Sequence, residues 1–344
     1  CHHPCESKCR AGEAGKPVSI RGLKRFVTDY GLKHGLCLKT ESVVDRNKEK
    51  VAIIGSGPAG LICAFYLAKK GYQATVFEKL PVIGGMLMTA IPKFRLPREI
   101  LDADLKFIKS SGFEIQTEKE LGKDFTIQEL FKQNFKAIFI ATGGHQSWEL
   151  GIPGEDSKGV LYGLEVLKDI NMDREIEVGK KVGIVGGGNS AVDAARALLR
   201  KGLSETVTIY YRRTITEMPA YKEEIDDALE EGIEIKFLTA PTKIISENGV
   251  LKGCEFVKME LGDVDTSGRR KPIPIEGSEF VVDIDSLVVA ISEYPDTSFL
   301  DKETELKVSE GGNIIVDPET LQTTQEGIFA GGDIVMASNT VIQA

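Results

Sequence analysis

The stretch VAIIGSGPAG at residues 51–60 decides the fold. A short apolar strand runs into Gly55-x-Gly57-x-x-Gly60, the spacing of a strand–turn–helix motif that binds a dinucleotide. In this motif the first glycine permits the tight turn, the second lets a pyrophosphate approach the backbone, and the third lets helix and strand pack closely. The start of the helix also offers N–H groups and a positive dipole end to the phosphates.

An acidic residue completes this first fingerprint. Glu78 follows the motif by about twenty residues, where a carboxylate can accept hydrogen bonds from both ribose hydroxyls and repels a 2′-phosphate. Because strand, helix and spaced acid agree, a nucleotide site is favoured over a purely structural glycine turn. The expected βαβ unit consists of strand 51–54, helix 59–70 and strand 74–78.

A second fingerprint, VGIVGGGNSA at residues 182–191, differs at the position that recognises the ribose. Its glycines are Gly186 and Gly188, and an alanine in the third place still allows close packing. The next strand ends in Arg212-Arg213 instead of an acid. Guanidinium groups bind phosphate bidentately and can stack on adenine, which favours NADPH over NADH. A solvated basic turn is the alternative.

Small residues elsewhere favour FAD for the first site. Gly84-Gly85 follows Glu78 closely, as suits a chain lying beside an extended flavin. Ala141-Thr142-Gly143 ends a further strand at the carboxyl edge of the expected sheet, where ligands lie in such folds. Gly332-Asp333 offers a carboxylate at a similar edge, suited to a ribityl hydroxyl, although an ordinary turn aspartate is the alternative.

Three of the six cysteines lie in the first nine residues, as Cys1-x-x-x-Cys5-x-x-x-Cys9. This spacing favours an iron–sulfur cluster, with zinc or unligated thiols as alternatives. Three thiolates are one short of four, so we expect further ligands upstream and a longer polypeptide at both ends. The other cysteines (37, 63 and 254) are expected to be small buried hydrophobes. No Cys-x-x-Cys occurs, which argues against a dithiol reductase.

The overall prediction is an α/β fold with two Rossmann-like dinucleotide-binding domains, the NADPH domain inserted in the FAD domain, preceded by a small helical iron–sulfur segment. The expected boundaries are 1–45 for the iron–sulfur segment, 46–150 and 294–344 for the two parts of the FAD domain, and 151–293 for the NAD(P)H domain. Further elements are expected as helices at 18–30, 98–110 and 220–231, strands at 136–141, 233–237, 286–291 and 327–333, an Asn248-Gly249 hairpin, and a helix starting near 339.

Composition excludes two classes of function. A net charge of −9 argues against bulk binding of nucleic acid. No apolar run reaches the ~18–20 residues of a membrane-spanning helix. Nucleotide chemistry and thiols together suggest the reducing cytoplasm.

Several motifs of this chain are found together in one family of proteins. They are Cys1-x-x-Pro4-Cys5-Glu6-x-x-Cys9, Pro17-Val-Ser-Ile20, Gly84-Gly-Met-Leu87, Ile91-Pro-Lys-Phe-Arg-Leu-Pro97, Gly186-Gly-Gly-Asn-Ser-Ala-Val-Asp193, Tyr211-Arg-Arg213, Glu217-Met-Pro-Ala220 and Phe329-Ala-Gly-Gly-Asp333. Over nearly all 344 residues the chain resembles the small (β) subunit of glutamate synthase and its relatives, which include the N-terminal part of dihydropyrimidine dehydrogenase and the large subunit of NADH-dependent ferredoxin:NADP oxidoreductase. The resemblance implies FAD, NADPH and [4Fe-4S] clusters that deliver electrons to a partner.

Motifs and resemblance together predict three sets of binding residues. The FAD set is Gly55, Gly57, Pro58, Ala59, Gly60, Glu78, Lys79, Gly85, Met86, Leu87, Arg95, Ala141, Thr142, Gly143, Gly332, Asp333, Thr340 and Val341. The NADP set is Gly186, Gly187, Gly188, Asn189, Ser190, Asp193, Arg212, Arg213, Ala290 and Ser292. The metal set is Cys1, Cys5 and Cys9.

These sets predict a flavoprotein electron-transfer subunit. It would oxidise NADPH by hydride transfer to FAD and pass electrons through iron–sulfur clusters to an iron–sulfur- or flavin-containing partner subunit or domain. No catalytic side chain is expected, because the cofactors carry the chemistry. The alternatives are an electron-bifurcating or reverse-running NAD(P)+ reductase subunit, and a non-catalytic FAD relay in a larger redox complex.

Overall fold

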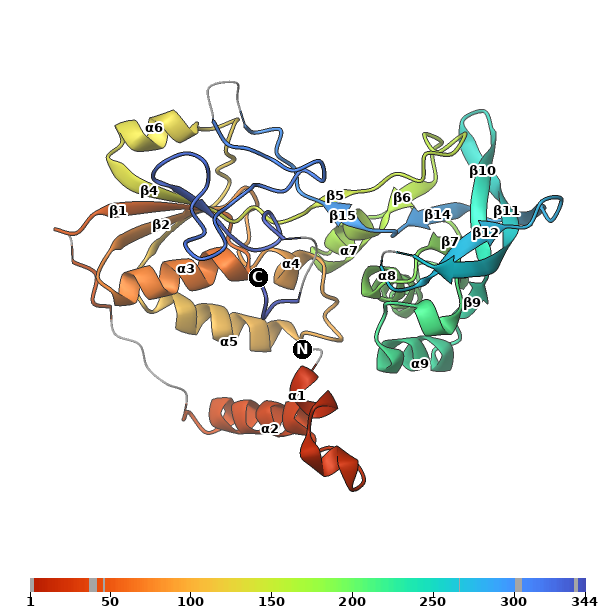
Figure 1. The fold of residues 1–344 in the computed structure, drawn as a ribbon, viewed down its shortest axis with the longest axis horizontal. Coiled ribbons are helices and arrows are strands. Elements are labelled where there is room, and N and C mark those ends of the chain that lie inside the picture. The colour runs from red at the N-terminus through yellow and green to blue at the C-terminus, as the bar shows by residue number, and fades with distance from the viewer. Residues whose placement is uncertain (1–2, 37–41, 46, 266, 301–304, 337–339) are drawn as a thin grey trace. The chain divides into compact units, whose positions relative to one another are not determined.

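A computed structural model describes residues 3–36, 42–45, 47–265, 267–300, 305–336 and 340–344 (Figure 1). The chain divides into two compact units. The first comprises Cys1–Gly84, Glu99–Gly143 and Asp296–Ala344, and the second Gly85–Arg98 and Gly144–Pro295. The second unit is thus inserted in the first, and it also takes in residues 85–98, which the sequence analysis assigned to the first domain.

The first unit is built on a parallel sheet in the order β16-β4-β1-β2-β3. The strands are β1 (Lys50–Ile54), β2 (Gln73–Phe77), β3 (Glu114–Gln116), β4 (Phe135–Ile140) and β16 (Ile328–Ala330). β1 is buried from residue 51 to 54, as expected for a central strand covered on both faces.

Helices cover both faces of this sheet. Ala52 and Ile54 of β1 pack with α6 (Ile127–Lys132) on one face. α3 (Pro58–Lys69) begins against Ile53 on the other face and lies beside α5 (Arg98–Lys109), as Figure 1 shows. The loops around the carboxyl end of β1 therefore stand on a rigid layered core.

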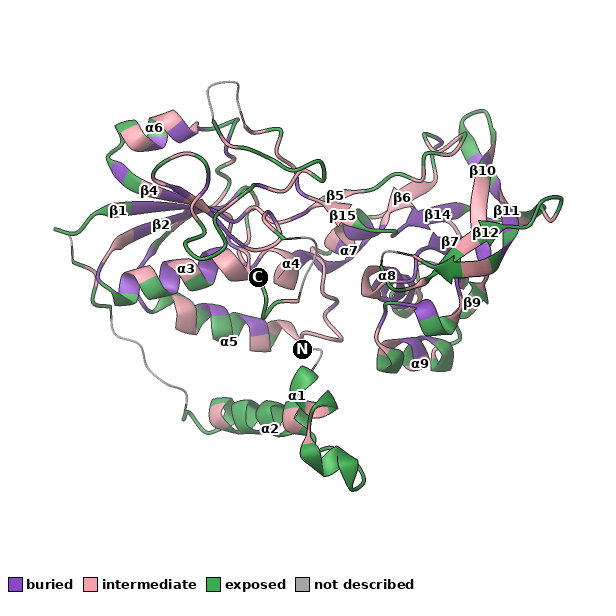
Figure 2. Cartoon of the chain, viewed as in Figure 1, coloured by how far each residue is buried: buried purple, intermediate pink, exposed green. Residues whose placement is uncertain are grey.

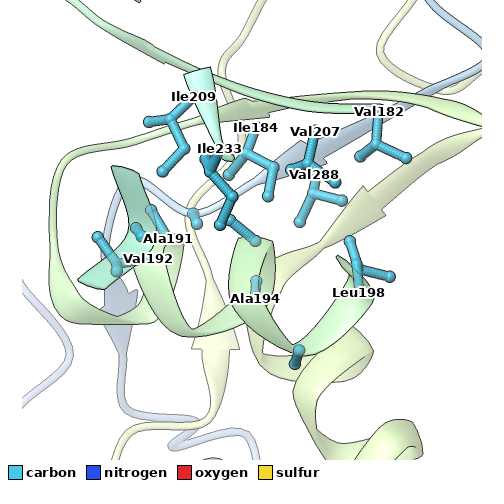
Figure 3. Packing of buried hydrophobic residues seen from close by; sticks show 14 of the residues in the cluster. Val182, Ile184, Ala191, Val192, Ala194, Leu198, Val207, Ile209, Ile233 and Val288 are labelled. Atoms are coloured by element: carbon cyan, nitrogen blue, oxygen red, sulfur yellow. The ribbon is translucent and has the colours of Figure 1, made fainter. Parts of the chain in front are cut away.

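The second unit repeats this plan with a sheet in the order β6-β14-β7-β8-β9, again all parallel. The strands are β6 (Val160–Tyr162), β7 (Lys181–Val185), β8 (Thr206–Tyr211), β9 (Glu234–Phe237) and β14 (Ser286–Val289). The helices are α4 (Met86–Thr89), α7 (Gly163–Asn171), α8 (Asn189–Arg200) and α9 (Lys222–Glu230). Figure 3 shows the apolar side of α8 packed under Ile184 and Ile209 of the sheet.

An antiparallel sheet covers the other face of the second unit. It consists of β10 (Thr239–Glu247), β11 (Val250–Val264), β12 (Arg270–Pro274) and β13 (Phe280–Asp283). The ring of Phe256 stacks on Tyr210 of β8 with centroids 4.1 Å apart. Asn248 and Gly249 have φ values of 53° and 75°, so the predicted type I′ hairpin is confirmed. A short pair, β5 (Gln146–Ser147) with β15 (Glu293–Tyr294), completes the unit.

The N-terminal segment contains α1 (Pro4–Ser7), the 3-10 helix η1 (Arg10–Glu13) and α2 (Ile20–Lys33), where a helix was predicted. A carboxylate joins two of these elements, because Glu6 Oε1 accepts a hydrogen bond from Arg21 N at 2.7 Å. None of the described residues in the three helices is buried (Figure 2). At the other terminus the chain turns, with Ala344 N donating to Thr340 O; residue 339, where a helix was expected to start, lies outside the described residues.

Candidate functional site

The first glycine turn is required by the packing of the chain itself. Gly55 has a φ of +102°, and a Cβ there would lie 2.4 Å from Ala141 O. A Cβ on Gly60 would lie 2.0 Å from Gly55 O. The turn from β1 into α3 is therefore as tight as the sequence motif predicts.

Gly57, between them, is different. It has an ordinary φ of −68° at the N-cap of α3, and a Cβ there would meet no protein atom within 4 Å. Gly188, its counterpart at the N-cap of α8, has a φ of −85°, and a Cβ there would likewise meet no protein atom within 4 Å. Neither glycine is needed by the protein's own packing, and each leaves a helix N-terminus bare for an anion.

The carboxylate of Glu78 is buried and held in place. Its Oε2 accepts hydrogen bonds from the backbone N (2.9 Å) and hydroxyl of Ser56, and its Oε1 accepts one from Leu80 N at 2.8 Å. A carboxylate has about four acceptor positions, so capacity remains for a ribose hydroxyl. Ser56 is the residue that sequence reasoning missed; a hydroxyl between the first two glycines was the available signal. Lys79, next in the chain, is exposed.

Small residues gather at the carboxyl edge of the first sheet. Thr142 follows β4, and its buried Oγ1 has no hydrogen-bond partner among the described residues. Gly143 has a φ of +73°, and a Cβ on Gly332 would lie 2.9 Å from Ala59 Cβ at the start of α3. FAD is an extended ligand. The buried hydroxyl of Thr142, which lacks a partner in the described part of the chain, and the open space at Gly57 fit such a ligand.

Six other members of the predicted FAD set belong to the second unit or to the last residues of the chain. Gly85, Met86 and Leu87 enter α4 in the second unit. Arg95, also in that unit, is paired with Asp193 at 2.6 Å and Glu224 at 3.2 Å. The hydroxyl of Thr340 contacts Gln343 Oε1 at 2.8 Å, and Val341 is exposed.

The second glycine turn has the same construction in the second unit. Gly186 has a φ of +152°, and a Cβ there would lie 2.1 Å from Ala290 O. Gly187 lies against the ring of Tyr211. Asn189 Oδ1 accepts a hydrogen bond from Tyr221 N (3.1 Å), which joins the start of α8 to that of α9.

Polar groups of two serines near this turn, one side chain and one backbone carbonyl, have partners within the unit. Ser190 Oγ donates to Glu293 Oε1 at 3.1 Å, and the carbonyl of Ser292 accepts from Trp148 N. Asp193, on α8, is buried; burial raises its pKa to about 6 against the opposing charge of Arg95. Its Oδ1 has no partner among the described residues.

The two arginines after β8 are not equivalent. Arg213 is buried, and its guanidinium donates to Asp265 Oδ2 and Arg270 O, both at 2.7 Å. Arg212 is exposed and forms no ion pair within the described part of the chain. Sequence reasoning treated them alike because it could not foresee the approach of Asp265.

The cysteines fall into two chemical groups. Backbone N–H groups of Val18 and Ala11 lower the pKa of Cys9, which favours the thiolate that a cluster needs. Cys5 is exposed, and Cys1 lies outside the described residues. Burial raises the pKa values of Cys63 and Cys254 to about 12. Across the described residues, no group of three or more His, Cys, Asp or Glu side chains is arranged to hold a metal ion.

This difference predicts selective alkylation. In protein freed of metal, iodoacetamide at neutral pH should modify Cys9 at least ~100-fold faster than Cys254, because the thiolate is the reactive form. Mass spectrometry of the digested protein measures both rates. In urea the two rates should converge. Equal rates in the folded protein would contradict the assignment.

Two α/β dinucleotide turns in one chain, one followed by an acid and the other by arginines, are typical of a nucleotide-dependent oxidoreductase. The sequence profile of the pyridine nucleotide-disulphide oxidoreductase family matches residues 49–344. The chain belongs to this family.

Its relatives agree with the resemblance found in the sequence. The NADP(+)-dependent formate dehydrogenase subunit beta of Moorella thermoacetica is 46% identical over 368 residues, which cover 100% of this chain and 51% of the relative. The glutamate synthase [NADPH] small chain of Escherichia coli (strain K12) is 34% identical, covering 99% and 75%. The chain spans about half the length of the first of these relatives.

A solved structure shares the fold. FprA of Mycobacterium tuberculosis in complex with NADPH superposes with a TM-score of 0.73 at 16% identity, over 86% of this chain and 81% of that one. In the part of the chain that the structure describes, no helix is long and apolar enough to cross a membrane.

Proposed function

We propose that this chain is the NADPH-oxidising flavoprotein module of an electron-transfer complex, with FAD at the first turn, NADP(H) at the second, and iron–sulfur clusters leading to a partner subunit or domain. The observation that carries the proposal is the pair of glycines, Gly57 and Gly188, that the protein does not need for its own packing. A residue without a side chain facing open space at a helix N-terminus suits a pyrophosphate.

Each turn would distinguish its nucleotide by its surroundings. The buried carboxylate of Glu78 would accept ribose hydroxyls and exclude a 2′-phosphate, whereas the exposed guanidinium of Arg212 would attract one. Thr142 would offer its orphaned hydroxyl to the flavin. When bound, FAD would supply the acceptor for the nicotinamide hydride and a source of single electrons.

The N-terminal cysteines would take the electrons onward. Cys5 and the thiolate-prone Cys9, with Cys1, would supply cluster ligands together with ligands from the rest of the polypeptide. The clusters would then reduce an iron–sulfur- or flavin-containing partner. Two relatives have NADPH in their names, a glutamate synthase [NADPH] small chain and an NADPH-Fe(3+) oxidoreductase subunit beta. These names favour electron flow from NADPH to the partner. The relative named as an NADP(+)-dependent formate dehydrogenase subunit favours the reverse direction as the second candidate.

A substitution at the cysteines tests the electron path. In the complete polypeptide, Cys5→Ala should leave NADPH reduction of an artificial dye unchanged and should lose reduction of the partner, because only the latter needs the clusters. Wild-type protein purified without oxygen should contain iron and acid-labile sulfide. Zinc without iron, or a partner still reduced at the wild-type rate by Cys5→Ala, would overturn the proposal.

A further inference from the structure

The tip of the β11–β12 hairpin, residues 265 and 267–270, is wound around one carboxylate. Asp265 accepts hydrogen bonds from the hydroxyl and the N (2.8 Å) of Ser267, and its own N donates to Arg269 O at 2.8 Å. Gly268 provides the left-handed turn, with a φ of +77°. Hydrogen bonds from the Ser267 hydroxyl first, and then from the N–H groups of Ser267 and Arg269, lower the pKa of Asp265 to about 2, so its carboxylate is ionised at neutral pH.

Two ion pairs fasten this tip to the end of β8. Arg213 reaches Asp265 and the carbonyl of Arg270, as described above. Arg270 in turn pairs with Glu217, whose carboxylate is already held by Thr214 at the start of the 3-10 helix η2 (Ile215–Glu217). The Nε and one terminal nitrogen of Arg213 are therefore occupied within the protein.

The two ion pairs at the hairpin tip leave the positive charges of Arg212 and Arg269 without a carboxylate partner in the ranges that the structure describes. Among the described residues, Arg213 pairs with Asp265 and Arg270 pairs with Glu217, whereas the neighbouring Arg212 and Arg269 form no ion pair. In the described part of the chain, the one hydrogen bond of the Arg269 side chain is donated by its Nε to the hydroxyl of Ser267 (3.1 Å).

These two charges also act on each other. Arg212 is exposed as a residue, yet protein surrounds part of its guanidinium. That burial first, and then the positive charges of Arg213 and Arg269, lower the pKa of Arg212. A dianionic group placed between them would relieve the repulsion.

We propose that Arg269, on the hairpin tip, binds the 2′-phosphate of NADP(H) together with Arg212, and that Arg213 is a positioning residue that holds the tip in place. The site lies at the carboxyl end of β8, the strand after the second glycine turn, where the adenosine ribose lies in such folds. This inference rests on the proposed function, namely that the second turn binds NADP(H).

A nucleotide fragment tests the phosphate contact without turnover. The ligands are 2′,5′-ADP and 5′-AMP, which differ only in the 2′-phosphate, titrated by calorimetry into the complete protein. Arg269→Ala should weaken binding of 2′,5′-ADP by ~10-fold or more, because a charge-assisted bond is lost, and should leave 5′-AMP unchanged. The matched control is Lys271→Ala, which removes an exposed cation two residues away and should change neither affinity.

The outcomes separate the two proposals. If Arg269→Ala binds 2′,5′-ADP as wild type does while Arg212→Ala does not, the role of Arg269 is refuted and the NADP site stands. If the wild-type protein binds 2′,5′-ADP no better than 5′-AMP, the proposed NADP preference itself fails.

Asp265→Asn tests the role of Arg213. This change removes the charge that anchors the tip but leaves all four arginines in place, and Asp265 is only partly buried, so the fold should persist. If Arg213 is a positioning residue, the affinity for 2′,5′-ADP should fall ~10-fold. If Arg213 instead binds the phosphate directly, freeing it from Asp265 should leave the affinity equal or raise it, which would overturn the assignment.

Discussion

Gly57→Val should abolish stoichiometric FAD binding and leave the protein folded. The position has an ordinary φ of −68°, and the new Cβ would meet no protein atom within 4 Å, so the fold tolerates it. The side chain would occupy the space that we assign to the pyrophosphate. Overpacking of that kind costs about 3 kcal/mol or more, or roughly 100-fold in affinity. Flavin absorbance of the purified protein and its circular dichroism measure the two effects.

Two other glycines provide matched controls. Gly188→Val should keep the flavin and lose its reduction by NADPH, because it alters only the second turn. Gly60→Ala should instead damage the fold, since its Cβ would lie 2.0 Å from Gly55 O. Full flavin content in Gly57→Val would place FAD elsewhere and sink the assignment of the first turn.

The features that the sequence predicts well are those set by residues close together in the chain. The glycine turns, the strands that precede them and the Asn248-Gly249 hairpin each depend on residues a few positions apart, and the backbone requirement at each glycine is visible in the motif. Element ends moved by up to three residues: the helix expected at 18–30 ends at Lys33, and the strand expected at 286–291 ends at Val289.

Long-range pairing accounts for what the sequence did not predict. Arg213 meets Asp265 across 52 positions, and Arg95 meets Asp193 across 98. No periodicity or motif marks such partners, because each side chain alone is compatible with many environments. The long strand β11 brings Asp265 to Arg213. The segment 85–98, which contains Arg95, belongs to the same unit as Asp193. Arg269 was missed for the same reason.

A cluster of charges on the helices of the second unit should contribute measurably to its stability. Arg196 of α8 has a side chain only 4% exposed, and its guanidinium binds Glu231 (2.7 Å), Glu224 and Asp227 of the α9 region. It also lies 4.8 Å from the centre of the Phe94 ring. Hydrogen bonds from Arg200, and then the bonds and charge of Arg196, lower the pKa of Glu231 to about 2 against its partial burial.

Arg196→Met is expected to lower the free energy of unfolding of the second unit by about 2–3 kcal/mol at neutral pH. Removing one member of a buried ion pair leaves its partners uncompensated, at a cost reduced here because the carboxylates are partly exposed. The matched control is Lys222→Met, which removes an exposed pair with Asp226 on α9 and should cost no more than about 0.5 kcal/mol.

Acid should narrow the difference in the free energy of unfolding between the wild type and Arg196→Met. The pKa of Glu231 is lower in the folded state, about 2, than its unfolded value of about 4.3, so its stabilising contribution is full above the unfolded pKa and is lost as the pH falls toward the folded one. The variant has less of this contribution to lose, so the two urea midpoints should approach each other between about pH 5 and pH 2. A cost for Arg196→Met no larger than for Lys222→Met, or a cost independent of pH in this range, would show that the cluster is a solvated surface network, since only charges withdrawn from water stabilise the fold enough to produce both effects.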